Sequence, residues 1–166
     1  FCFIDAHQVD IPEPPYPPHC IDGSTESELM DELAWFYDHE LVTCFKKDCI
    51  NSYIGAINPQ TGENAFENWV KENKFETLIF VGVCTDICVT DCVLTTLSAR
   101  NHQLLSKLKD VVVYVPGCAT YDMTKPHLRE LNLPIHMNHP EGLMHHIGLK
   151  MMSFRGAILS EQINFN

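Results

Sequence analysis

Short apolar runs alternate with longer amphipathic segments along the 166-residue chain. β-branched and aromatic residues are concentrated in five short runs and predict strands at Phe1–Ile4, Leu41–Phe45, Thr77–Val83, Val111–Val115 and Ala157–Ser160. The third run is apolar almost throughout, which is typical of a central parallel strand with both faces covered. Pro116 and Gly117 predict the end of the fourth strand.

The segments between these strands carry apolar residues at helical spacing. They predict helices over residues 24–36, 65–73, 86–100 and 140–152. Ser24 or Thr25 is placed to cap the first of these helices. Loops are expected over Gln8–Gly23, which is rich in proline, and over Asn51–Glu63, which contains Asn-Pro and Thr-Gly turn signals.

Strands that alternate with helices predict βαβ units with right-handed crossovers. We therefore expect an α/β fold of three layers, in which helices cover both faces of a doubly wound, mostly parallel, Rossmann-like sheet. A chain of this length is expected to form one domain, residues 1–166. In such folds ligands bind at the carboxyl ends of the strands, so the residues that follow each strand are the candidates for function.

The charge of the chain helps to exclude some classes of binding partner. The formal net charge is −11, and the 11 Lys and Arg residues are scattered, which argues against a nucleic-acid partner. An acidic surface suits a protein that acts on a small neutral or cationic molecule. No apolar run reaches membrane-spanning length, so no membrane partner is expected.

The spacing of the eight cysteines does not indicate a disulfide framework. Three recur at helical intervals and three lie in strand-like runs, at Cys84, Cys88 and Cys92 and at Cys2, Cys44 and Cys118. Cysteine in such places behaves as a small apolar residue. We therefore expect a reducing compartment, the cytoplasm or the nucleus.

One cysteine lies where a strand passes into a helix. Cys88 follows the predicted central strand closely enough to fall in the first turn of the next helix. Unpaired backbone amides and the positive end of the helix dipole favour a thiolate there, and the same amides suit the oxyanion of a tetrahedral intermediate. Cys88 is therefore a candidate nucleophile; the alternative is that it fills the helix interior as Cys92 does. A redox or metal role for Cys84 with Cys88 fits less well, because three residues separate them.

Acidic and imidazole side chains follow the first predicted strand. Asp5 and His7 are two residues apart and point the same way in an extended chain. His19 follows on a segment that two prolines stiffen. One carboxylate and two imidazoles with open positions suit Zn, Fe or Mn in a catalytic site, with Glu13 or Asp10 as the candidate fourth ligand. The alternative is a set of ordinary loop residues.

Two lysines, Lys46 and Lys47, follow the second predicted strand. At the carboxyl end of a strand, one of them could point into the cleft and stabilise a thiolate or a carboxylate. The alternative is a solvated pair, since lysine is mostly exposed.

Taken together, these segments resemble the isochorismatase-like cysteine hydrolase superfamily and, within it, the nicotinamidases, those of the plant type above all. The string Gly-Val-Cys-Thr-Asp-Ile-Cys-Val at residues 82–89 is specific to the superfamily. Asp5-Ala6-His7 with Tyr16-Pro17-Pro18-His19-Cys20 resembles the nicotinamidase metal site. Lys47–Asn51 and Met144-His145-His146 extend the resemblance over nearly the whole chain.

The resemblance implies catalytic roles for the residues at matching positions. Cys88 matches the family nucleophile and Lys47 the catalytic lysine, with Lys46 the weaker match. The amides of Cys84 and Cys88 match the oxyanion hole, and the Val83–Cys84 bond matches the family's cis peptide.

The resemblance also implies a metal and a substrate pocket. Asp5, His7 and His19 match the ligands of a divalent metal, with zinc expected and iron or manganese as alternatives. Tyr16 matches one aromatic wall of the pocket, and Tyr53 is the candidate for a second. The family often forms homo-oligomers, which makes a homo-oligomer a candidate state for this protein.

One residue of the family's catalytic set has no match. The catalytic aspartate lies at the end of the family's first strand, upstream of the position that Phe1 matches. The chain opens without Met and inside an apolar run, so we expect that the first strand is missing together with its aspartate. The chain is then expected to be a fragment, or a product that is weak or dead as an enzyme.

The activity that the resemblance implies is hydrolysis of nicotinamide to nicotinate and ammonia through a cysteine thioester, a step of NAD salvage. One alternative is another hydrolase of the superfamily, which acts on isochorismate or a ureido-type amide without a metal. A second is a truncated, non-catalytic binding protein, and a cysteine redox protein comes last. A metal assay separates the first alternative from a nicotinamidase, and a turnover assay separates the second.

Overall fold

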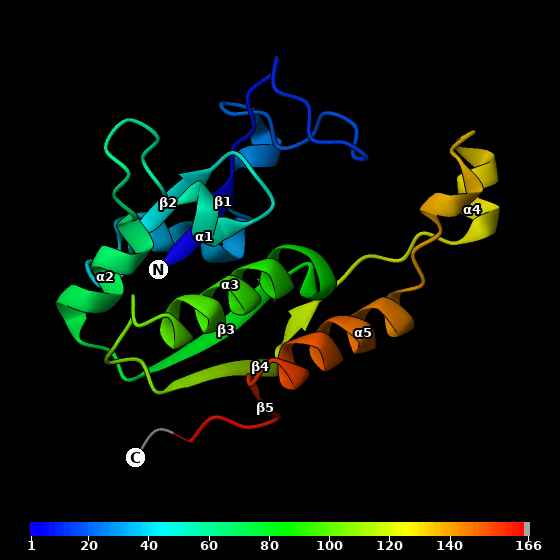
Figure 1. The fold of residues 1–166 in the computed structure, drawn as a ribbon. Coiled ribbons are helices and arrows are strands. Elements are labelled where there is room, and N and C mark those ends of the chain that lie inside the picture. The colour runs from blue at the N-terminus through cyan, green and yellow to red at the C-terminus, as the bar shows by residue number, and fades with distance from the viewer. Residues whose placement is uncertain (165–166) are drawn as a thin grey trace. The chain divides into compact units, whose positions relative to one another are not determined.

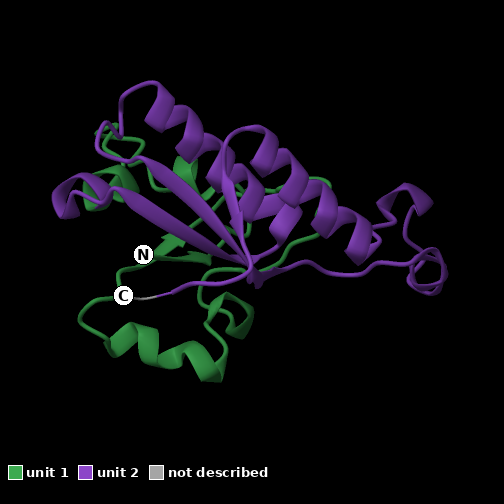
Figure 2. Ribbon diagram, turned by 90° about the horizontal axis from the view of Figure 1, so that it is seen from below, with its two compact units in different colours: residues 1–69 green, residues 70–166 purple. Residues whose placement is uncertain are grey.

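Parallel strands joined by helices make up the computed structural model, which describes residues 1–164. The chain divides into two compact units, unit 1 from Phe1 to Trp69 and unit 2 from Val70 onward (Figure 2). Every strand pair in either unit is parallel, which confirms the predicted α/β class. No helix within the described residues has both the length and the apolar character needed to cross a membrane. The single domain expected over residues 1–166 stays a prediction.

Unit 1 is built on a two-stranded sheet. β1 (Cys2–Asp5) lies beside β2 (Cys44–Lys47) (Figure 1). The register places the last residues of the two strands, Asp5 and Lys47, opposite each other. The long connection between the strands contains two short 3-10 helices, η1 (Thr25–Ser27) and η2 (Asp31–Asp38).

Two helices follow β2. α1 (Ser52–Gly55) begins where the Asn51 side chain accepts hydrogen bonds from the amides of Tyr53 and Ile54, and this cap satisfies donors that the first turn leaves unpaired. α2 (Ala65–Asn73) starts in unit 1 and runs past its boundary. Aromatic rings from β1, β2 and α2 pack together with centroid separations between 4.9 and 6.2 Å, at Phe1, Phe3, Phe45, Phe66 and Trp69.

Unit 2 is built on a three-stranded parallel sheet. Its strands lie in the order β3 (Thr77–Val83), β4 (Asp110–Ala119), β5 (Ile158–Ser160). The crossovers between them contain α3 (Thr90–Asn101) and α5 (Glu141–Phe154), which lie on one face of this sheet (Figures 1 and 2). A π-type turn, η3 (Thr85–Val89), joins β3 to α3.

The excursion between β4 and α5 contains a helix that sequence analysis misses. α4 (Lys125–Glu130) is capped by Thr124 and is followed by a 3-10 turn, η4 (Ile135–Met137). The signals were present, since Thr124 is a favoured cap and a proline occupies the first turn of the helix.

Most of the predicted strands and helices are confirmed, and three expectations for unit 1 differ from the structure. The helix expected over residues 24–36 is two 3-10 helices separated by extended backbone, and no side chain of η2 is buried. A helix in a protein is stabilised mainly by packing an apolar face, and that packing is missing here. The strand expected over Leu41–Phe45 is shifted to Cys44–Lys47, because residues 39–42 form a turn and Leu41 is exposed. Part of the loop expected over Asn51–Glu63 is α1.

The two longest strands of unit 2 also depart from expectation. β4 continues through Pro116 to Ala119, because a register shift opposite residues 80–82 of β3 absorbs the proline that cannot donate to the ladder. In β3 one side of the strand is exposed at Ile79, Val81 and Val83, so coverage of both faces is not observed.

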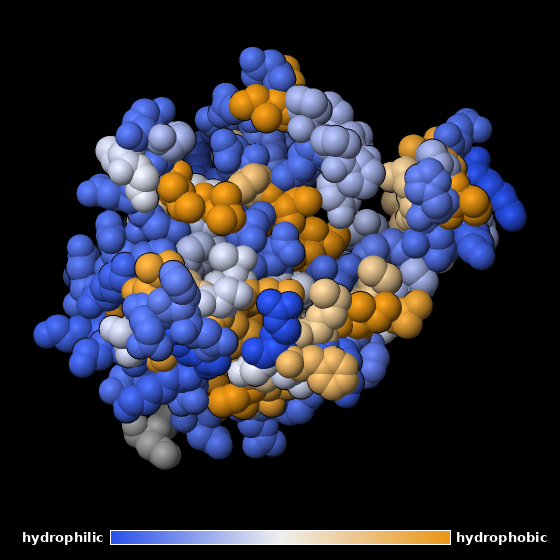
Figure 3. Space-filling view, in the orientation of Figure 1, coloured by the Kyte–Doolittle hydropathy of each residue, from blue (hydrophilic) through white to orange (hydrophobic). Residues whose placement is uncertain are grey.

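α5 carries apolar side chains on two sides. Gly148 and Met152 are buried against the rest of unit 2. Four side chains one turn apart lie on an exposed side, at Leu143, Ile147, Met151 and Phe154, and apolar atoms are visible along this helix in Figure 3.

The core of unit 2 forms where α3 and α5 meet β4. Val93, Leu97, Val111, Val113 and Met152 are each exposed by 2% or less. Removing a buried leucine side chain from such a core costs both its transfer free energy and a cavity term.

We therefore expect Leu97→Ala to lower the free energy of unfolding by about 2–5 kcal/mol. Leu143→Ala is the matched control, because Leu143 is also helical but 56% exposed; its effect should stay within about 0.5 kcal/mol. Urea denaturation followed by circular dichroism measures both. Equal effects of the two substitutions would contradict the assignment of Leu97 to the core.

Candidate active site

Three candidate metal ligands converge on the loop that follows β1. The Nε2 atom of His7 lies 3.7 Å from Oε2 of Glu13, and Nε2 of His19 lies 4.0 Å from the same oxygen. The three ligand atoms lie within 4.8 Å of one another, and residues 1–164 contain no second group of this kind. One cation could bind all three after a small inward shift of the side chains.

The second nitrogen of each imidazole is held by the backbone. Nδ1 of His7 lies 3.1 Å from the Asp48 carbonyl oxygen, and Nδ1 of His19 lies 2.9 Å from the Pro17 carbonyl oxygen. A carbonyl only accepts, so each Nδ1 donates its hydrogen and each Nε2 keeps its lone pair for a cation. Hydrogen bonds of this type fix the tautomer of histidines that bind metals. The residues present therefore fit a divalent cation.

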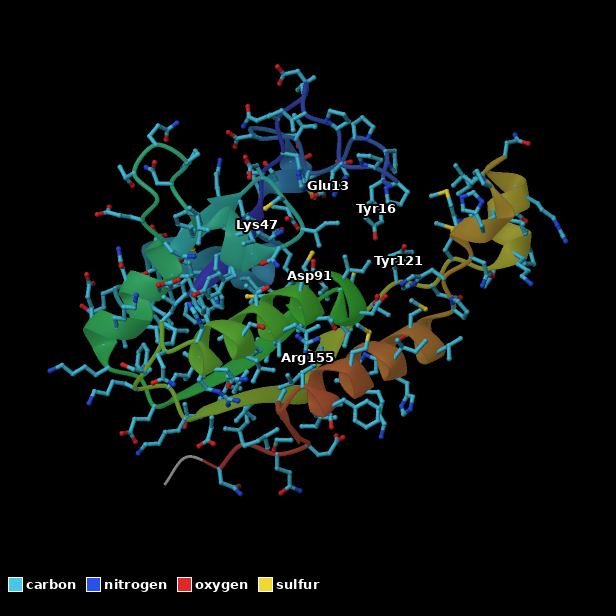
Figure 4. All side chains as sticks on the ribbon, in the orientation of Figure 1. Glu13, Tyr16, Lys47, Asp91, Tyr121 and Arg155 are labelled. Carbon is cyan, nitrogen blue, oxygen red and sulfur yellow. The ribbon has the colours of Figure 1, made fainter. Side chains whose placement is uncertain are left out.

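Glu13 is oriented by the chain that follows β2. Its Oε1 atom accepts a hydrogen bond of 2.7 Å from the Ile50 amide, which leaves Oε2 directed at the two histidines. Sequence analysis leaves Glu13 and Asp10 as alternatives for the further ligand, and the geometry selects Glu13. A concavity of about 60 Å³ lies beside the cluster and is lined in part by Tyr16, whose ring centroid is 5.9 Å from that of His19 (Figure 4).

The two lysines of β2 have different surroundings. Lys47 is 4% exposed, and its Nζ donates to Asp5 and, at 2.9 Å, to the Cys49 carbonyl. Lys46 points outward and pairs with Asp22 at 2.6 Å. Successive side chains of a strand face opposite sides, so only one of two adjacent lysines can face inward. The geometry makes Lys47 the candidate for chemistry.

Asp5 lies between Lys47 and the histidines. Besides its bond with Lys47, its Oδ1 atom is 3.7 Å from Nε2 of His7. The structure therefore brings Asp5 next to the cluster, but Glu13 rather than Asp5 completes the group of converging ligand atoms. Asp5 as a direct metal ligand stays a prediction.

The candidate nucleophile lies on the turn between β3 and α3 in unit 2. The Val83–Cys84 peptide bond is cis, as predicted, and the preceding Gly82 has a φ of 141° that favours glycine. In η3 the amides of Ile87 and Val89 both donate to the Cys84 carbonyl, at 3.1 and 3.2 Å. π-type turns of this kind are frequent at functional sites.

Cys88 and Cys92 differ in their burial. Cys88 lies in η3, two residues before α3 begins, and is half-buried, whereas Cys92 is 4% exposed. Cys88 is thus not helix filler in the manner of Cys92. Its role as nucleophile, and that of its amide and the Cys84 amide as an oxyanion hole, stay predictions.

Two histidines that sequence analysis leaves without a role contact this turn. Nδ1 of His145 lies 2.8 Å from the Thr85 hydroxyl, and Nε2 of His139 lies 2.8 Å from Oδ2 of Asp86. These contacts span 60 and 53 residues of sequence. No local spacing pattern signals a contact of that range, so the sequence alone could not reveal it.

Tyr53 does not lie beside the metal cluster. The side chain is 4% exposed, its ring packs against Phe66 at 5.9 Å, and its hydroxyl donates to Glu67 at 2.5 Å. These contacts fasten α1 to α2. They give no support to the prediction that Tyr53 forms a wall of the substrate pocket.

Several other thiols are held in the neutral form. Burial is the main cause that raises the pKa of Cys2, Cys20, Cys49 and Cys118 above the ordinary value for a thiol. At Cys20 the nearby carboxylate of Asp5 raises the pKa further. A raised pKa lowers the fraction of thiolate at neutral pH, so these four cysteines should react slowly with alkylating reagents.

Comparison with known sequences gives one family and one similar protein. The chain matches the Isochorismatase domain over residues 4–133. Nicotinamidase 1 from Arabidopsis thaliana is 48% identical to the chain over 171 residues. That alignment covers 98% of this chain and 66% of the relative, so the chain spans slightly less than two thirds of the relative's length.

Solved structures share the fold at low sequence identity. The nicotinamidase PncA from Bacillus subtilis has a TM-score of 0.63 at 18% identity, covering 96% of this chain and 72% of its own. N-carbamoylsarcosine amidase from Thermoplasma acidophilum has a TM-score of 0.61 at 16% identity, covering 98% and 73%. PnC1 from L. infantum, solved in complex with nicotinate, has a TM-score of 0.56 at 16% identity, covering 88% and 60%. These likenesses confirm the predicted α/β fold.

Proposed function

The chain belongs to the isochorismatase family, and from this premise we propose that the protein that contains it is a nicotinamidase. It hydrolyses nicotinamide to nicotinate and ammonia through a cysteine thioester. The observation that carries the proposal is the convergence of His7 Nε2, Glu13 Oε2 and His19 Nε2 beside an aromatic ring. The 48% identity to Nicotinamidase 1 from Arabidopsis thaliana supports the same substrate.

The residues of unit 1 bind and orient the substrate in this proposal. His7, Glu13 and His19, with Asp5 as the candidate fourth ligand, hold a divalent cation. When bound, this cation supplies a Lewis-acid position that a pyridine nitrogen can occupy. Tyr16 offers an aromatic face to the pyridine ring, since its ring lies beside His19.

Unit 2 supplies the nucleophile. Cys88 Sγ attacks the carboxamide carbon, and the amides of Cys84 and Cys88 donate to the oxyanion that forms. Collapse of this intermediate releases ammonia and leaves a thioester, which water hydrolyses to nicotinate and the free thiol. The proton of the thiol passes to the nitrogen that leaves as ammonia, and Lys47, whose side chain is buried, is the catalytic lysine of this proposal.

The proposal extends to the metal and the setting of the reaction. Zinc is the ion we assign, because two histidines and a carboxylate with an open position are a common catalytic zinc set; iron and manganese are the alternatives. The reaction belongs to NAD salvage in the cytoplasm, with the nucleus as a second compartment. A homo-oligomer is the alternative to a monomer.

Two other functions compete with this one. The fold alone does not separate a nicotinamidase from an amidase of ureido substrates, since PncA and N-carbamoylsarcosine amidase have TM-scores of 0.63 and 0.61 with this chain. A metal assay separates them, because these relatives are expected to work without a metal. A binding protein without turnover is the second competitor.

The test measures metal content and ammonia release by the protein that carries this sequence. Nicotinamide, N-carbamoylsarcosine and isochorismate are the substrates, with pyruvate formation as the readout for isochorismate. We expect bound zinc, iron or manganese, and a kcat/KM for nicotinamide that exceeds the other two by about 100-fold or more. Turnover of another substrate by metal-free protein would favour the first competitor. Binding of nicotinamide without ammonia release would establish the second.

A further inference from the structure

The turn that carries Cys88 is braced by side chains from far along the chain. Asp86 lies two residues before Cys88, and its carboxylate is buried, with the side chain only 4% exposed. Oδ1 accepts a hydrogen bond of 2.6 Å from the Thr120 hydroxyl, just after β4. Oδ2 lies 2.8 Å from Nε2 of His139, whose side chain is 9% exposed. Both carboxylate oxygens are therefore occupied by partners from the segment that follows the turn in sequence.

His139 is itself held on every side. Nδ1 lies 2.9 Å from the Tyr121 carbonyl oxygen, and the Tyr121 ring stacks on the imidazole at 4.0 Å with an interplanar angle of 11°. The backbone of His139 exchanges two hydrogen bonds of 2.9 Å with Met123. The imidazole can neither turn nor withdraw without breaking several of these contacts, so its position fixes the position of Asp86.

The partners of His139 also fix the direction of one of its hydrogen bonds. A backbone carbonyl accepts hydrogen bonds and cannot donate them, so Nδ1 donates to the Tyr121 carbonyl. One hydrogen then lies between Nε2 and Oδ2 of Asp86, and this hydrogen bond joins the ring to the turn.

Two further contacts brace the same turn from α5. Thr85 is fully buried, and its hydroxyl lies 2.8 Å from Nδ1 of His145. Gly148 passes so close that a Cβ at this position would lie 2.7 Å from the Asp86 Cα. Residues 84–88 thus have little freedom, because side chains and backbone from later in the sequence hold Thr85 and Asp86 in place.

We propose that His139 is a positioning residue for the nucleophile turn: through its hydrogen bond with Asp86, it holds the Cys84–Cys88 backbone in the geometry that the chemistry at Cys88 requires. The expected effect on the rate rests on the proposed function. The expected effect on the backbone of residues 84–88 rests only on the geometry of unit 2. The contacts of His139 described above are with Asp86, Tyr121 and Met123, so in this proposal it acts on the thiol through the turn. Its loss should therefore change the rate of the chemical step rather than the binding of nicotinamide.

The first arm of the test is kinetic. We expect His139→Ala to lower kcat for nicotinamide by about 100-fold, the cost of a small misplacement of catalytic groups, with KM within about twofold of wild type. His139→Gln keeps one donor for Asp86 and should recover part of the loss. His127→Ala is the matched control, because His127 lies on α4 in the same excursion and is exposed. The control should leave kcat unchanged.

The second arm tests the pair. If Asp86 and His139 act together, Asp86→Asn and His139→Gln should be strongly non-additive, and the double variant should be little worse than the more damaging single one. Nitrogen-15 NMR of the histidine side chains supplies a signature that a merely structural role would not require. In the wild-type protein Nδ1 of His139 should carry a hydrogen, and the Nε2 resonance of the ring should shift in Asp86→Asn because its hydrogen-bond partner has changed.

The third arm does not depend on the substrate. The rate at which iodoacetamide alkylates Cys88 at neutral pH, followed by mass spectrometry, should fall about tenfold in His139→Ala and stay unchanged in His127→Ala. If the wild-type protein fails to release ammonia from nicotinamide, the proposed function fails, and the alkylation and NMR arms still decide this proposal. If His139→Ala does not fold, His139→Gln takes its place in every arm.

Several results would overturn the proposed role of His139. A kcat and an alkylation rate within twofold of wild type in folded His139→Ala would overturn the proposal, as would a change confined to KM. Additive effects of Asp86→Asn and His139→Gln, or an Nε2 resonance of His139 that Asp86→Asn leaves unchanged, would remove the pair on which the proposal depends.

Discussion

Cys88→Ala is expected to abolish ammonia release from nicotinamide, with a loss of about 10⁴-fold or more in kcat. Alanine has no group that can form a thioester, and the remaining interactions only bind and polarise the carboxamide. Metal content should stay at the wild-type level, because the cluster of His7, Glu13 and His19 lies on a separate loop of unit 1. Coupled detection of ammonia measures the first quantity and elemental analysis the second.

Cys92→Ala is the control for this result. Cys92 lies one helical turn beyond Cys88, is buried, and lies in the regular part of α3. Its replacement should change stability slightly and kcat little. Alkylation of the wild-type protein adds a second check, in which Cys88 should react faster than Cys20, Cys49 and Cys118. Their raised pKa values make these three thiols react slowly with alkylating reagents at neutral pH. Turnover by Cys88→Ala at anything near the wild-type rate would show that the nucleophile assignment is wrong.

Loss of the metal cluster is the second large effect that we expect. His7→Ala removes a buried imidazole whose Nδ1 is already fixed by the Asp48 carbonyl, so a pre-oriented ligand disappears. Metal affinity should fall by about 100-fold or more, since even loss of an outer partner of a ligand costs about 10- to 100-fold. Ammonia release should fall in parallel, because the pyridine ring loses its anchor. Glu13→Gln should weaken metal binding as well, through loss of the negative charge.

The measurement compares elemental analysis with activity across a titration of zinc. His102→Ala is the control, because His102 is exposed at the end of α3 and belongs to unit 2. Treatment of the wild-type protein with a chelator should reproduce the loss, and added zinc should restore activity to the chelated wild type but not to His7→Ala at the same concentration. Full activity of chelated, metal-free protein would rule out the cation in the reaction and favour the metal-independent relatives.

Strong periodicity made much of the fold predictable. Ala65–Asn73 and Thr77–Val83 are predicted to the residue, because a clear amphipathic face and an uninterrupted apolar run each leave one reading. The segment at residues 24–36 shows the limit. Its apolar residues have helical spacing, yet no side chain of η2 is buried, so nothing in the packing rewards a long helix. The spacing of apolar residues shows which side chains could be buried on one face of a helix, and only the tertiary contacts show which of them are buried.

The candidate site divides in the same way. The sequence indicates the residue types of the candidate site: a cysteine between a strand and a helix, an Asp-x-His after a strand, and a histidine that follows two prolines. Spacing alone does not choose between two similar residues that lie close together in the sequence. Lys46 and Lys47 are identical in the sequence, and only the facing of β2 directs one toward Asp5 and the other toward Asp22. Glu13 is a better candidate metal ligand than Asp10, because the Ile50 amide donates to one of its carboxylate oxygens and leaves the other directed at the histidines.

The order of residue types along the chain therefore determined the class of fold and the segments that hold the candidate site residues, since propensity and spacing are local properties. The contacts between side chains that are far apart in the sequence were decided only by the tertiary structure. His139 reaches Asp86 across 53 residues and His145 reaches Thr85 across 60, distances over which no periodicity carries information. Those contacts exist because α5 and the excursion before it return to the turn after β3, and packing of the folded chain is the only cause that brings them there.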